Sequence, residues 1–198
     1  MNIVERAKNM ILSPKTEWPV VGAEEPNVGQ VITGYVIPLA AIPAVAQIIG
    51  IGLIGSGFMH SFTAGVAMGI VSFVAAVVGV YVTAFVVDLL APNFGSQKNF
   101  GRAIQLVAYS YTPAWVAGVL NIVPPLGPIA LLAGLYGLYL LYLGLPHTMK
   151  TPQDKVVVYL VVTIIVLILV SFILFAILTP IALAIFGFGM LSGMGGMQ

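Results

Sequence analysis

Apolar residues fill five stretches of this chain, and short connections rich in proline, glycine or charged residues separate them. A helix needs about 20 apolar residues to cross the hydrocarbon core of a bilayer, and each stretch has that length or comes close to it. The pattern therefore predicts an all-α membrane protein, built as a bundle of five transmembrane helices. The stretches run from Val31 to Ile54, Phe62 to Leu90, Ala103 to Val123, Ile129 to Leu145 and Val156 to Phe186.

The fifth and third stretches differ most in their tendency to insert. Between Val156 and Leu178 almost every residue is leucine, isoleucine, valine or phenylalanine, which makes insertion strongly favourable. The third stretch carries polar residues between Gln105 and Thr112 and then Pro113, so we expect it to insert with help from its neighbours. A re-entrant third segment is the alternative.

Two terminal segments flank the five stretches. Residues 1–30 are predicted to form a cytoplasmic N-terminal segment, residues 31–186 the membrane domain, and residues 187–198 a flexible tail rich in glycine and methionine. Near the N-terminus, apolar residues at helical spacing oppose polar ones, which predicts a short amphipathic helix. We expect it either to lie on the membrane surface or to be solvated and packed on a neighbouring loop. Its apolar side holds Ile3, Val4, Ala7, Met10 and Ile11, and its polar side Glu5, Arg6, Lys8 and Asn9.

The positive charges fall only in alternate connections of this five-span arrangement. Cations are enriched on the cytoplasmic side of membrane proteins, so these connections are predicted to be cytoplasmic. The N-terminus is then cytoplasmic, and the protein is a multi-pass protein of the cell membrane. The first group is Arg6, Lys8 and Lys15, the second Lys98 and Arg102, and the third Lys150 and Lys155.

Overall composition agrees with a bilayer as the solvent. Hydrophobic residues make up 60% of the 198 residues and charged residues only 7%, whereas soluble domains are about a quarter charged. The net charge of +1 comes from scattered cations, so nucleic acid is excluded as a partner. The absence of cysteine excludes disulfides, thiolate metal sites and thiol nucleophiles.

Proline and glycine inside the apolar stretches indicate that the helices pack against one another. A proline kinks its helix and frees a carbonyl, which a bilayer tolerates only where neighbours satisfy that carbonyl. The residues from Gly65 to Gly69 form a GxxxG motif, which lets two helix backbones approach closely. We expect this motif to serve packing within the chain rather than a dedicated dimer face, and a homo-oligomer remains the alternative.

Few polar groups lie within the stretches. Asp88 is near the cytoplasmic end of the second stretch, where it is expected to be solvated or paired with Lys98 or Arg102. Amides and hydroxyls elsewhere either join the helices or line a path for a small solute or ion, which makes a transporter or channel the alternative function. The residues of this candidate path are Gln47, Gln105, Tyr109, Thr112 and Tyr139.

The sequence favours a protein that is not an enzyme. His60 and His147 fall on opposite sides of the membrane in the five-span arrangement, so they cannot share a metal. The chain has no HExxH, GxSxG, Walker or dinucleotide-binding glycine motif. We therefore expect no catalytic, cofactor-binding or metal-binding residues.

Three strings of the sequence closely resemble the prokaryotic branch of the Yip domain family, membrane proteins related to the eukaryotic Rab-interacting Yip proteins. They are RAKNMILSPKTEWP from Arg6 to Pro19, DLLAPNFGSQKNFGRAIQLVAYSYTPAWVAG from Asp88 to Gly118, and GLYGLYLLYLGLPHTMKTP from Gly134 to Pro152. The resemblance implies a five-segment helical membrane domain. Eukaryotic relatives act in vesicle trafficking, small-GTPase interaction and membrane shaping, and they carry a long N-terminal region with a DLYGP-like motif. No such motif occurs in this chain, so the resemblance does not imply Rab binding.

Many of the matching positions lie at the predicted cytoplasmic side, which suggests that this side carries the function. We expect a non-enzymatic membrane protein that organises lipids or partner proteins from its cytoplasmic face. Its partners would be membrane lipids and, in addition, membrane or cytoplasmic proteins. A water-filled cavity between the third and fourth segments would favour transport, and a lipid-filled groove would favour the organising role. The candidate cytoplasmic surface comprises Asp88, Pro92, Lys98, Arg102, His147 and Lys150.

Overall fold

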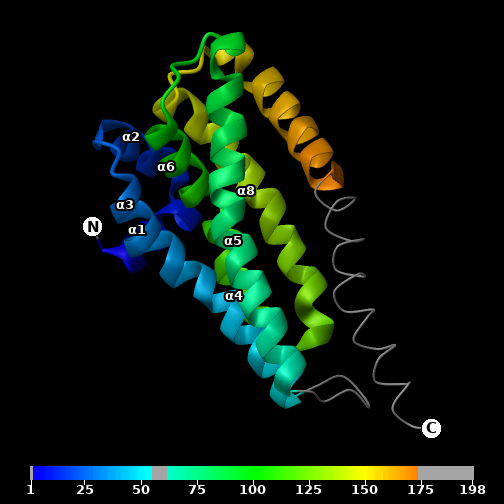
Figure 1. Cartoon of the computed structure of the whole chain (residues 1–198). Coiled ribbons are helices and arrows are strands. Elements are labelled where there is room, and N and C mark those ends of the chain that lie inside the picture. The colour runs from blue at the N-terminus through cyan, green and yellow to red at the C-terminus, as the bar shows by residue number, and fades with distance from the viewer. Residues whose placement is uncertain (1, 55–61, 174–198) are drawn as a thin grey trace, which may run out of the picture. The chain divides into compact units, whose positions relative to one another are not determined.

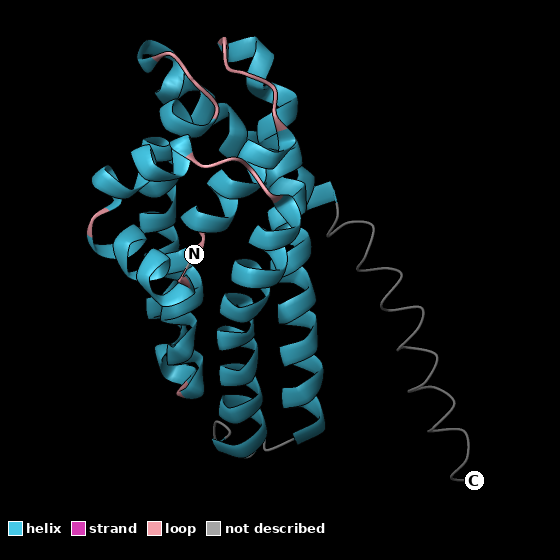
Figure 2. Ribbon diagram, turned by 90° about the vertical axis from the view of Figure 1, so that its left-hand side faces the viewer, coloured by secondary structure: helices cyan, strands magenta, loops and turns pink. Residues whose placement is uncertain are grey.

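The computed structural model describes residues 2–54 and 62–173, and all regular secondary structure in these ranges is helical (Figure 2). This confirms the all-α prediction. The chain divides into two compact units, Met1–Leu160 and Val161–Gln198. The predicted C-terminal tail and the end of the fifth stretch, residues 174–186, lie outside the described residues, as does the connection at residues 55–61.

Three described helices are long and apolar enough to cross a membrane. They span Val28–Ile54, Phe62–Phe94 and Gln153–Ile173, which agrees with the first, second and fifth predicted stretches. Helix α8, Gly127–Thr148, has 22 residues and corresponds to the fourth stretch. The third stretch is broken into shorter pieces, and the count of five membrane crossings stays a prediction.

The first span contains a widened turn that brings Tyr35 into the core. It consists of α3 (Val28–Val31), the π turn η1 (Ile32–Val36), α4 (Ile37–Ile49) and a second π turn η2 (Gly50–Ile54). Pro38 has no amide proton and disturbs the normal helical bonds of the preceding turn. The amide of Ile37 bonds to the carbonyl of Ile32, five residues earlier, and the Tyr35 side chain is fully buried.

The long helix α5 (Phe62–Leu90) runs alongside α4 (Figure 1). A β-carbon on Gly65 would lie 2.7 Å from the backbone nitrogen of Gly52, and one on Gly69 would lie 2.8 Å from the carbonyl oxygen of Ala44. These glycines therefore let the two backbones touch. The expectation that this GxxxG motif packs within the chain is confirmed.

After α5 and the short helix η3 (Ala91–Phe94), the third predicted stretch forms three successive helices. They are α6 (Phe100–Ser110), α7 (Thr112–Ala117) and the 3-10 helix η4 (Gly118–Ile122), and the 3-10 turn η5 (Pro124–Leu126) leads into α8. The break at Tyr111 precedes Pro113, as expected from a residue that cannot continue the helical bonding pattern. The third stretch is thus kinked, and its insertion with help from its neighbours stays a prediction.

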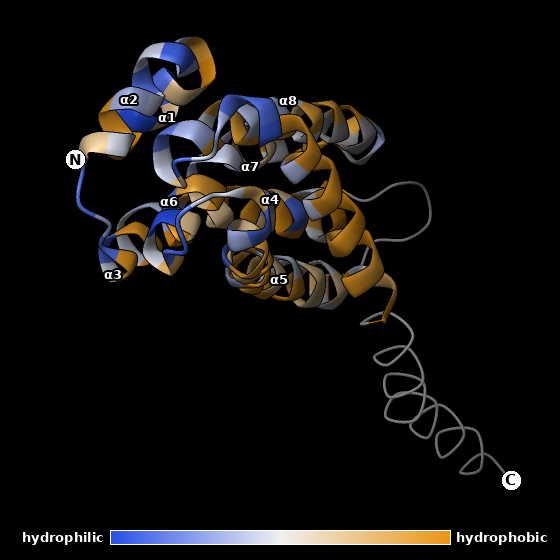
Figure 3. Ribbon diagram, turned by 90° about the horizontal axis from the view of Figure 1, so that it is seen from above, coloured by the Kyte–Doolittle hydropathy of each residue, from blue (hydrophilic) through white to orange (hydrophobic). Residues whose placement is uncertain are grey.

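Two of the three cationic segments, the connection that carries Lys98 and the connection that carries Lys150, meet at one end of the first unit. The amide of Gln97 donates to the carbonyl of Met149 at 2.8 Å, and the hydroxyls of Ser96 and Thr151 are 2.9 Å apart. The connections that carry Lys98 and Lys150 therefore lie together, as the charge pattern predicts. Hydrophilic residues gather on α1, α2, α3 and the start of α6, whereas α4 and α5 are mostly hydrophobic (Figure 3).

The N-terminal residues form a helical hairpin, α1 (Ile3–Leu12) and α2 (Pro14–Ala23), that docks on the bundle. Helix α1 packs against α2, α6 and α7, and α2 packs against α8. Ala7 and Met10 are buried as predicted, but the predicted exposure of Arg6 is wrong, because its side chain turns inward to acidic partners. Val4, which was assigned to the same apolar side as Ala7 and Met10, is not buried with them but is 72% exposed.

Candidate functional site

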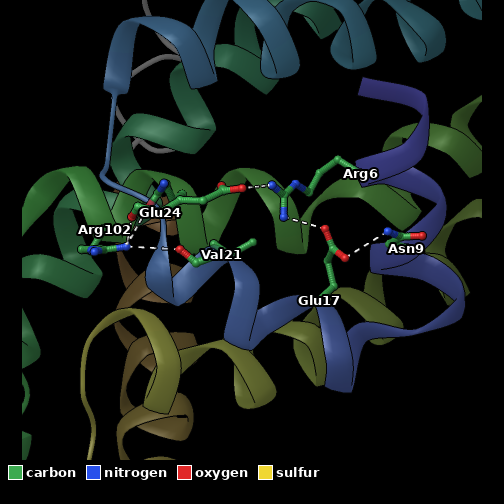
Figure 4. Close-up of polar contacts among 7 residues, drawn as sticks. Arg6, Asn9, Glu17, Val21, Glu24 and Arg102 are labelled. Atoms are coloured by element: carbon green, nitrogen blue, oxygen red, sulfur yellow. Dashed lines mark hydrogen bonds and ion pairs between the residues drawn. The ribbon is translucent and has the colours of Figure 1, made fainter. Parts of the chain in front are cut away.

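A buried ion network joins the two helices of the hairpin (Figure 4). The Arg6 side chain is only 4% exposed. Its Nη1 lies 2.5 Å from Oε1 of Glu17, and its Nη2 pairs with Oε1 of Glu24. The second carboxylate oxygen of Glu17 accepts a 3.0 Å bond from Nδ2 of Asn9. One guanidinium with two carboxylates therefore fixes α1 on α2 in a defined geometry.

Arg102 connects the same hairpin to α6. Its Nη1 donates to the carbonyl of Val21 at 3.2 Å and to that of Glu24 at 2.6 Å. These are terminal carbonyls of α2, which carry the negative end of the helix dipole and favour a cation. The same nitrogen donates to Oε1 of Gln105 at 3.3 Å. Arg102 thus acts as a C-terminal cap that holds α2 against α6.

The ring of Tyr109 forms the floor of this network. The Arg6 guanidinium carbon lies 5.4 Å from the centre of the ring, within cation–π range. Tyr35 packs edge-on against Tyr109 with centroids 4.8 Å apart, and Trp18 lies tilted at 6.5 Å. An aromatic cluster from α2, η1 and α6 therefore separates the ion network from the apolar bundle.

Two separate pairs of hydroxyl groups, Tyr35 with Thr112 and Tyr111 with Thr83, stabilise the kink before Pro113. Pro113 cannot donate to the carbonyl of Tyr109, and the Thr112 hydroxyl donates to this carbonyl instead, at 2.7 Å. Because Thr112 has only one hydroxyl proton, the 2.7 Å contact with Tyr35 must be a bond donated by the Tyr35 hydroxyl. A second bond, 2.8 Å long, joins the hydroxyls of Tyr111 and Thr83. The kink is therefore anchored to the first span and to α5.

Replacing Thr112 with valine should destabilise the protein. The Tyr35 hydroxyl would be left buried without its acceptor, at a cost of about 1–3 kcal/mol. Thermal unfolding of the full-length protein in detergent measures the loss. Thr148→Val is a matched control, because that buried hydroxyl bonds only to the Gly144 carbonyl of its own helix. Equal melting temperatures for the two variants would contradict the assigned role. Adding Tyr35→Phe to Thr112→Val should recover part of the loss.

The structure gathers three of the five residues of the candidate path. Gln105, Tyr109 and Thr112 lie around the hairpin and the kink, and their polar groups bond to protein groups. Gln47 is instead bonded to Ser72 of α5 at 3.2 Å. Tyr139 is 39% exposed, and its ring packs on that of Tyr136. The five residues therefore form separate contacts rather than one continuous lining.

Asp88 is buried and does not form the expected ion pair. It is 8% exposed, and its Oδ1 has no hydrogen-bond partner. No ion pair joins it to Lys98 or Arg102, which are both within the described residues. Arg102 is directed to the carbonyls of α2 instead, which explains why the ion-pair alternative is wrong. The neighbouring Tyr159 hydroxyl donates to the carbonyl of Val87.

The other residues of the predicted cytoplasmic surface lie at the same end of the first unit. Pro92, Lys98 and Lys150 are exposed, and Lys150 adopts a left-handed conformation with φ of 54° after the end of α8. His147, beyond the fourth apolar stretch, is half-buried. Burial, and secondarily the charge of Lys150, lower the pKa of His147 below its usual value of 6.5.

Two polar cavities flank the ion network. One, of about 380 Å³, is lined by residues of the hairpin, and Arg6, Glu17 and Glu24 contribute to its wall. The other, of about 240 Å³, lies between the hairpin, α3 and α6. The lining of the second cavity includes Glu24, Glu25, Asn27, Gln30, Gln105 and Tyr109. The described residues contain no group of three or more His, Asp or Glu side chains that could hold a metal ion.

Sequence reasoning missed the centre of this site, the Arg6, Glu17 and Glu24 cluster. One signal was available: two glutamates seven residues apart fall on one side of a helix. An arginine from a preceding helix could then reach both carboxylates. Helical periodicity alone places a charged residue on the exposed side, so it could not identify this cluster.

Comparisons with known proteins give a consistent family assignment. Residues 8–175 match the family model of the Yip1 domain. The inner membrane protein YohC of Escherichia coli K12 is 25% identical over 117 residues, which make up 56% of this chain and 60% of the relative. YohC of Escherichia coli O6:H1 matches with the same identity and coverage. The matched region is therefore less than two thirds of either relative. No solved structure matches the chain.

Proposed function

This chain belongs to the Yip1 domain family, and we propose that it is a non-enzymatic, multi-pass membrane protein that organises lipids or partner proteins at its cytoplasmic face. The cytoplasmic assignment rests on the distribution of positive charge. Its cationic connections lie together at the end where the hairpin docks. This end therefore meets the lipid headgroups of the cytoplasmic leaflet.

The outer face of α1 is the observation that carries the proposal. Val4, Lys8 and Leu12 follow one another at intervals of four residues, so they lie on one side of the helix. Val4 is 72% and Leu12 68% exposed, and Lys8 is exposed between them. Apolar residues beside a lysine with a long aliphatic stem suit the boundary between headgroups and acyl chains. Because Arg6 fixes the opposite side of α1, this face is presented in a rigid orientation.

The contacts of the candidate path support an organising role over transport. Gln47 and Thr112 use their side chains to join helices, and the Gln105 side chain accepts a bond from Arg102 of its own helix. The cavity between the third and fourth segments, described below, is lined mainly by apolar groups. Such a cavity suits a lipid better than a hydrated solute.

Lipid analysis of the protein in its own membrane tests the proposal. Extraction of the full-length chain in copolymer nanodiscs keeps neighbouring lipids for mass spectrometry. Each lysine near an anionic leaflet contributes about 1 kcal/mol, so anionic lipids should be enriched several-fold over the bulk membrane. Val4→Ser with Leu12→Ser should lower this enrichment, because the helix face loses its apolar contacts.

A matched control is Val71→Ser with Val74→Ser, which changes two exposed valines on α5. This control should leave the enrichment near that of the unmodified protein. If the unmodified protein carries lipids in the same proportions as the bulk membrane, and no stoichiometric protein partner accompanies it, the organising role is refuted.

A further inference from the structure

A small cavity lies between the kinked third segment and the middle of α8. Its volume is about 150 Å³. Ser110, Tyr111 and Ala114 form one wall, and Gly134, Gly137 and Leu141 of α8 contribute to the other. The Tyr111 hydroxyl is already bonded to Thr83. Apart from Ser110, the side chains that line this cavity offer a ligand only apolar surface.

Ser110 contributes a buried hydroxyl that has no partner. The residue is 0% exposed, and its Oγ forms no hydrogen bond. A serine in a helix often donates to the carbonyl four residues earlier, but Ser110 does not. Leaving such a group unsatisfied is unfavourable. Because Ser110 belongs to the wall of the cavity, a rotation of its side chain about the Cα–Cβ bond would let the hydroxyl donate to a molecule there.

We propose that this cavity binds an apolar molecule that carries one neutral carbonyl oxygen, which accepts a hydrogen bond from the Ser110 hydroxyl. An apolar cavity of about 150 Å³ in a soluble protein holds a molecule the size of benzene, so the volume fits one small ring or a short piece of chain. A charged group is excluded, because no charged residue lines the cavity to offset its desolvation.

Neither water nor a plain hydrocarbon chain meets both requirements of the cavity, which are to fill its apolar volume and to accept a bond from the Ser110 hydroxyl. A buried water needs two to four polar partners, and the side chains here supply one. A hydrocarbon fills the volume but leaves the Ser110 hydroxyl without an acceptor. Membranes contain two sources of the required chemistry: the ester carbonyl of an acyl lipid and the ring carbonyl of a quinone.

This site is independent of the hairpin function. The cavity shares no lining residue with the α1 face of Val4, Lys8 and Leu12. Failure of the lipid enrichment test would leave the cavity proposal standing, and failure of the cavity proposal would leave the hairpin role standing.

The chain offers two variants that separate filling of the cavity from the hydrogen bond. A β-carbon on Gly134 would meet no atom within 4 Å, so Gly134→Leu can occupy the cavity without a backbone clash. It also replaces glycine with a better helix former, which preserves folding. Ser110→Ala removes only the hydroxyl. Gly137 is unsuitable, because a β-carbon there would lie 2.8 Å from the Ser110 carbonyl oxygen.

Binding of two matched probes tests the proposal. Octanophenone and octylbenzene have similar size and apolar surface, but only octanophenone carries a carbonyl. Equilibrium dialysis with the full-length protein in detergent should show octanophenone binding about 5–10-fold more tightly, as expected for one buried hydrogen bond. Ser110→Ala should remove this preference while retaining octylbenzene binding. Gly134→Leu should lose both probes, and melting temperatures near that of the unmodified protein verify that both variants are folded.

Competition with octanophenone identifies the source of the carbonyl. Displacement by dioctanoylglycerol identifies an acyl ester, and displacement by octylbenzoquinone identifies a quinone. The proposal is overturned if the unmodified protein binds the two probes equally, if folded Ser110→Ala keeps the preference, if folded Gly134→Leu still binds octanophenone, or if neither competitor displaces it.

Discussion

Arg6→Ala should release the α1–α2 hairpin from the bundle and strongly destabilise the protein. The substitution leaves the carboxylate of Glu17, whose side chain is 12% exposed, without its cation. Removing one partner of a buried ion pair costs about 3–5 kcal/mol, because the remaining charge is uncompensated. The cation–π contact with Tyr109 is lost as well. Hydrogen exchange of the α1 and α2 amides in detergent should rise by orders of magnitude.

Lys8→Ala provides the control, since Lys8 lies on the exposed side of the same helix. Its exchange pattern should match that of the unmodified protein. The combined variant Arg6→Met, Glu17→Gln and Glu24→Gln should restore part of the protection, because it removes all three charges together. Unchanged exchange in Arg6→Ala would show that the ion network does not hold the hairpin.

Trp18→Ala should have an effect of similar size through packing alone. Trp18 is fully buried, and its ring lies against Gly144 of α8 and near Tyr109. Truncating a buried tryptophan costs about 3–5 kcal/mol, through lost apolar burial and the cavity that remains. The indole nitrogen forms no hydrogen bond, so the loss comes from packing. Thermal unfolding in detergent should therefore show a large drop in the melting temperature of Trp18→Ala.

Val20→Ala is the matched control for Trp18→Ala. Val20 lies on the same helix but is exposed, so its truncation should change the melting temperature little. If Trp18→Ala and Val20→Ala have the same melting temperature, α2 does not contribute to the core. Docking of the hairpin on α8 would then have to be rejected.

Hydrophobic patterning predicted most of the helices, because burial in a bilayer or a bundle imposes long apolar runs. The expected stretches from Val31 and from Phe62 agree closely with Val28–Ile54 and Phe62–Phe94. The distribution of positive charge correctly predicted that the connections carrying Lys98 and Lys150 lie at the same end. Pro113 marked the interruption of the third stretch. These features depend on local composition, which the sequence displays directly.

The polar contacts could not be predicted in the same way, because each depends on a partner distant in the sequence. Arg6 was assigned to the exposed side of its helix, since nothing in its own helix indicates Glu17 and Glu24. Asp88 was expected to meet a nearby cation, but the guanidinium of Arg102 faces the end of α2. The bond between Tyr35 and Thr112 joins residues 77 positions apart. Periodicity carries no information on such pairs.

The two hydroxyl pairs at the kink before Pro113 affect how the protein can assemble during synthesis. Chains are synthesised from the N-terminus, so Tyr35 and Thr83 leave the ribosome before Thr112 and Tyr111, which they contact. When the kinked segment enters the translocation machinery, Tyr35 and Thr83, which form hydrogen bonds with it, have already been synthesised. Helix α8, which packs on both α6 and α7, is synthesised after the kinked segment. The order of synthesis is therefore also a workable order of assembly.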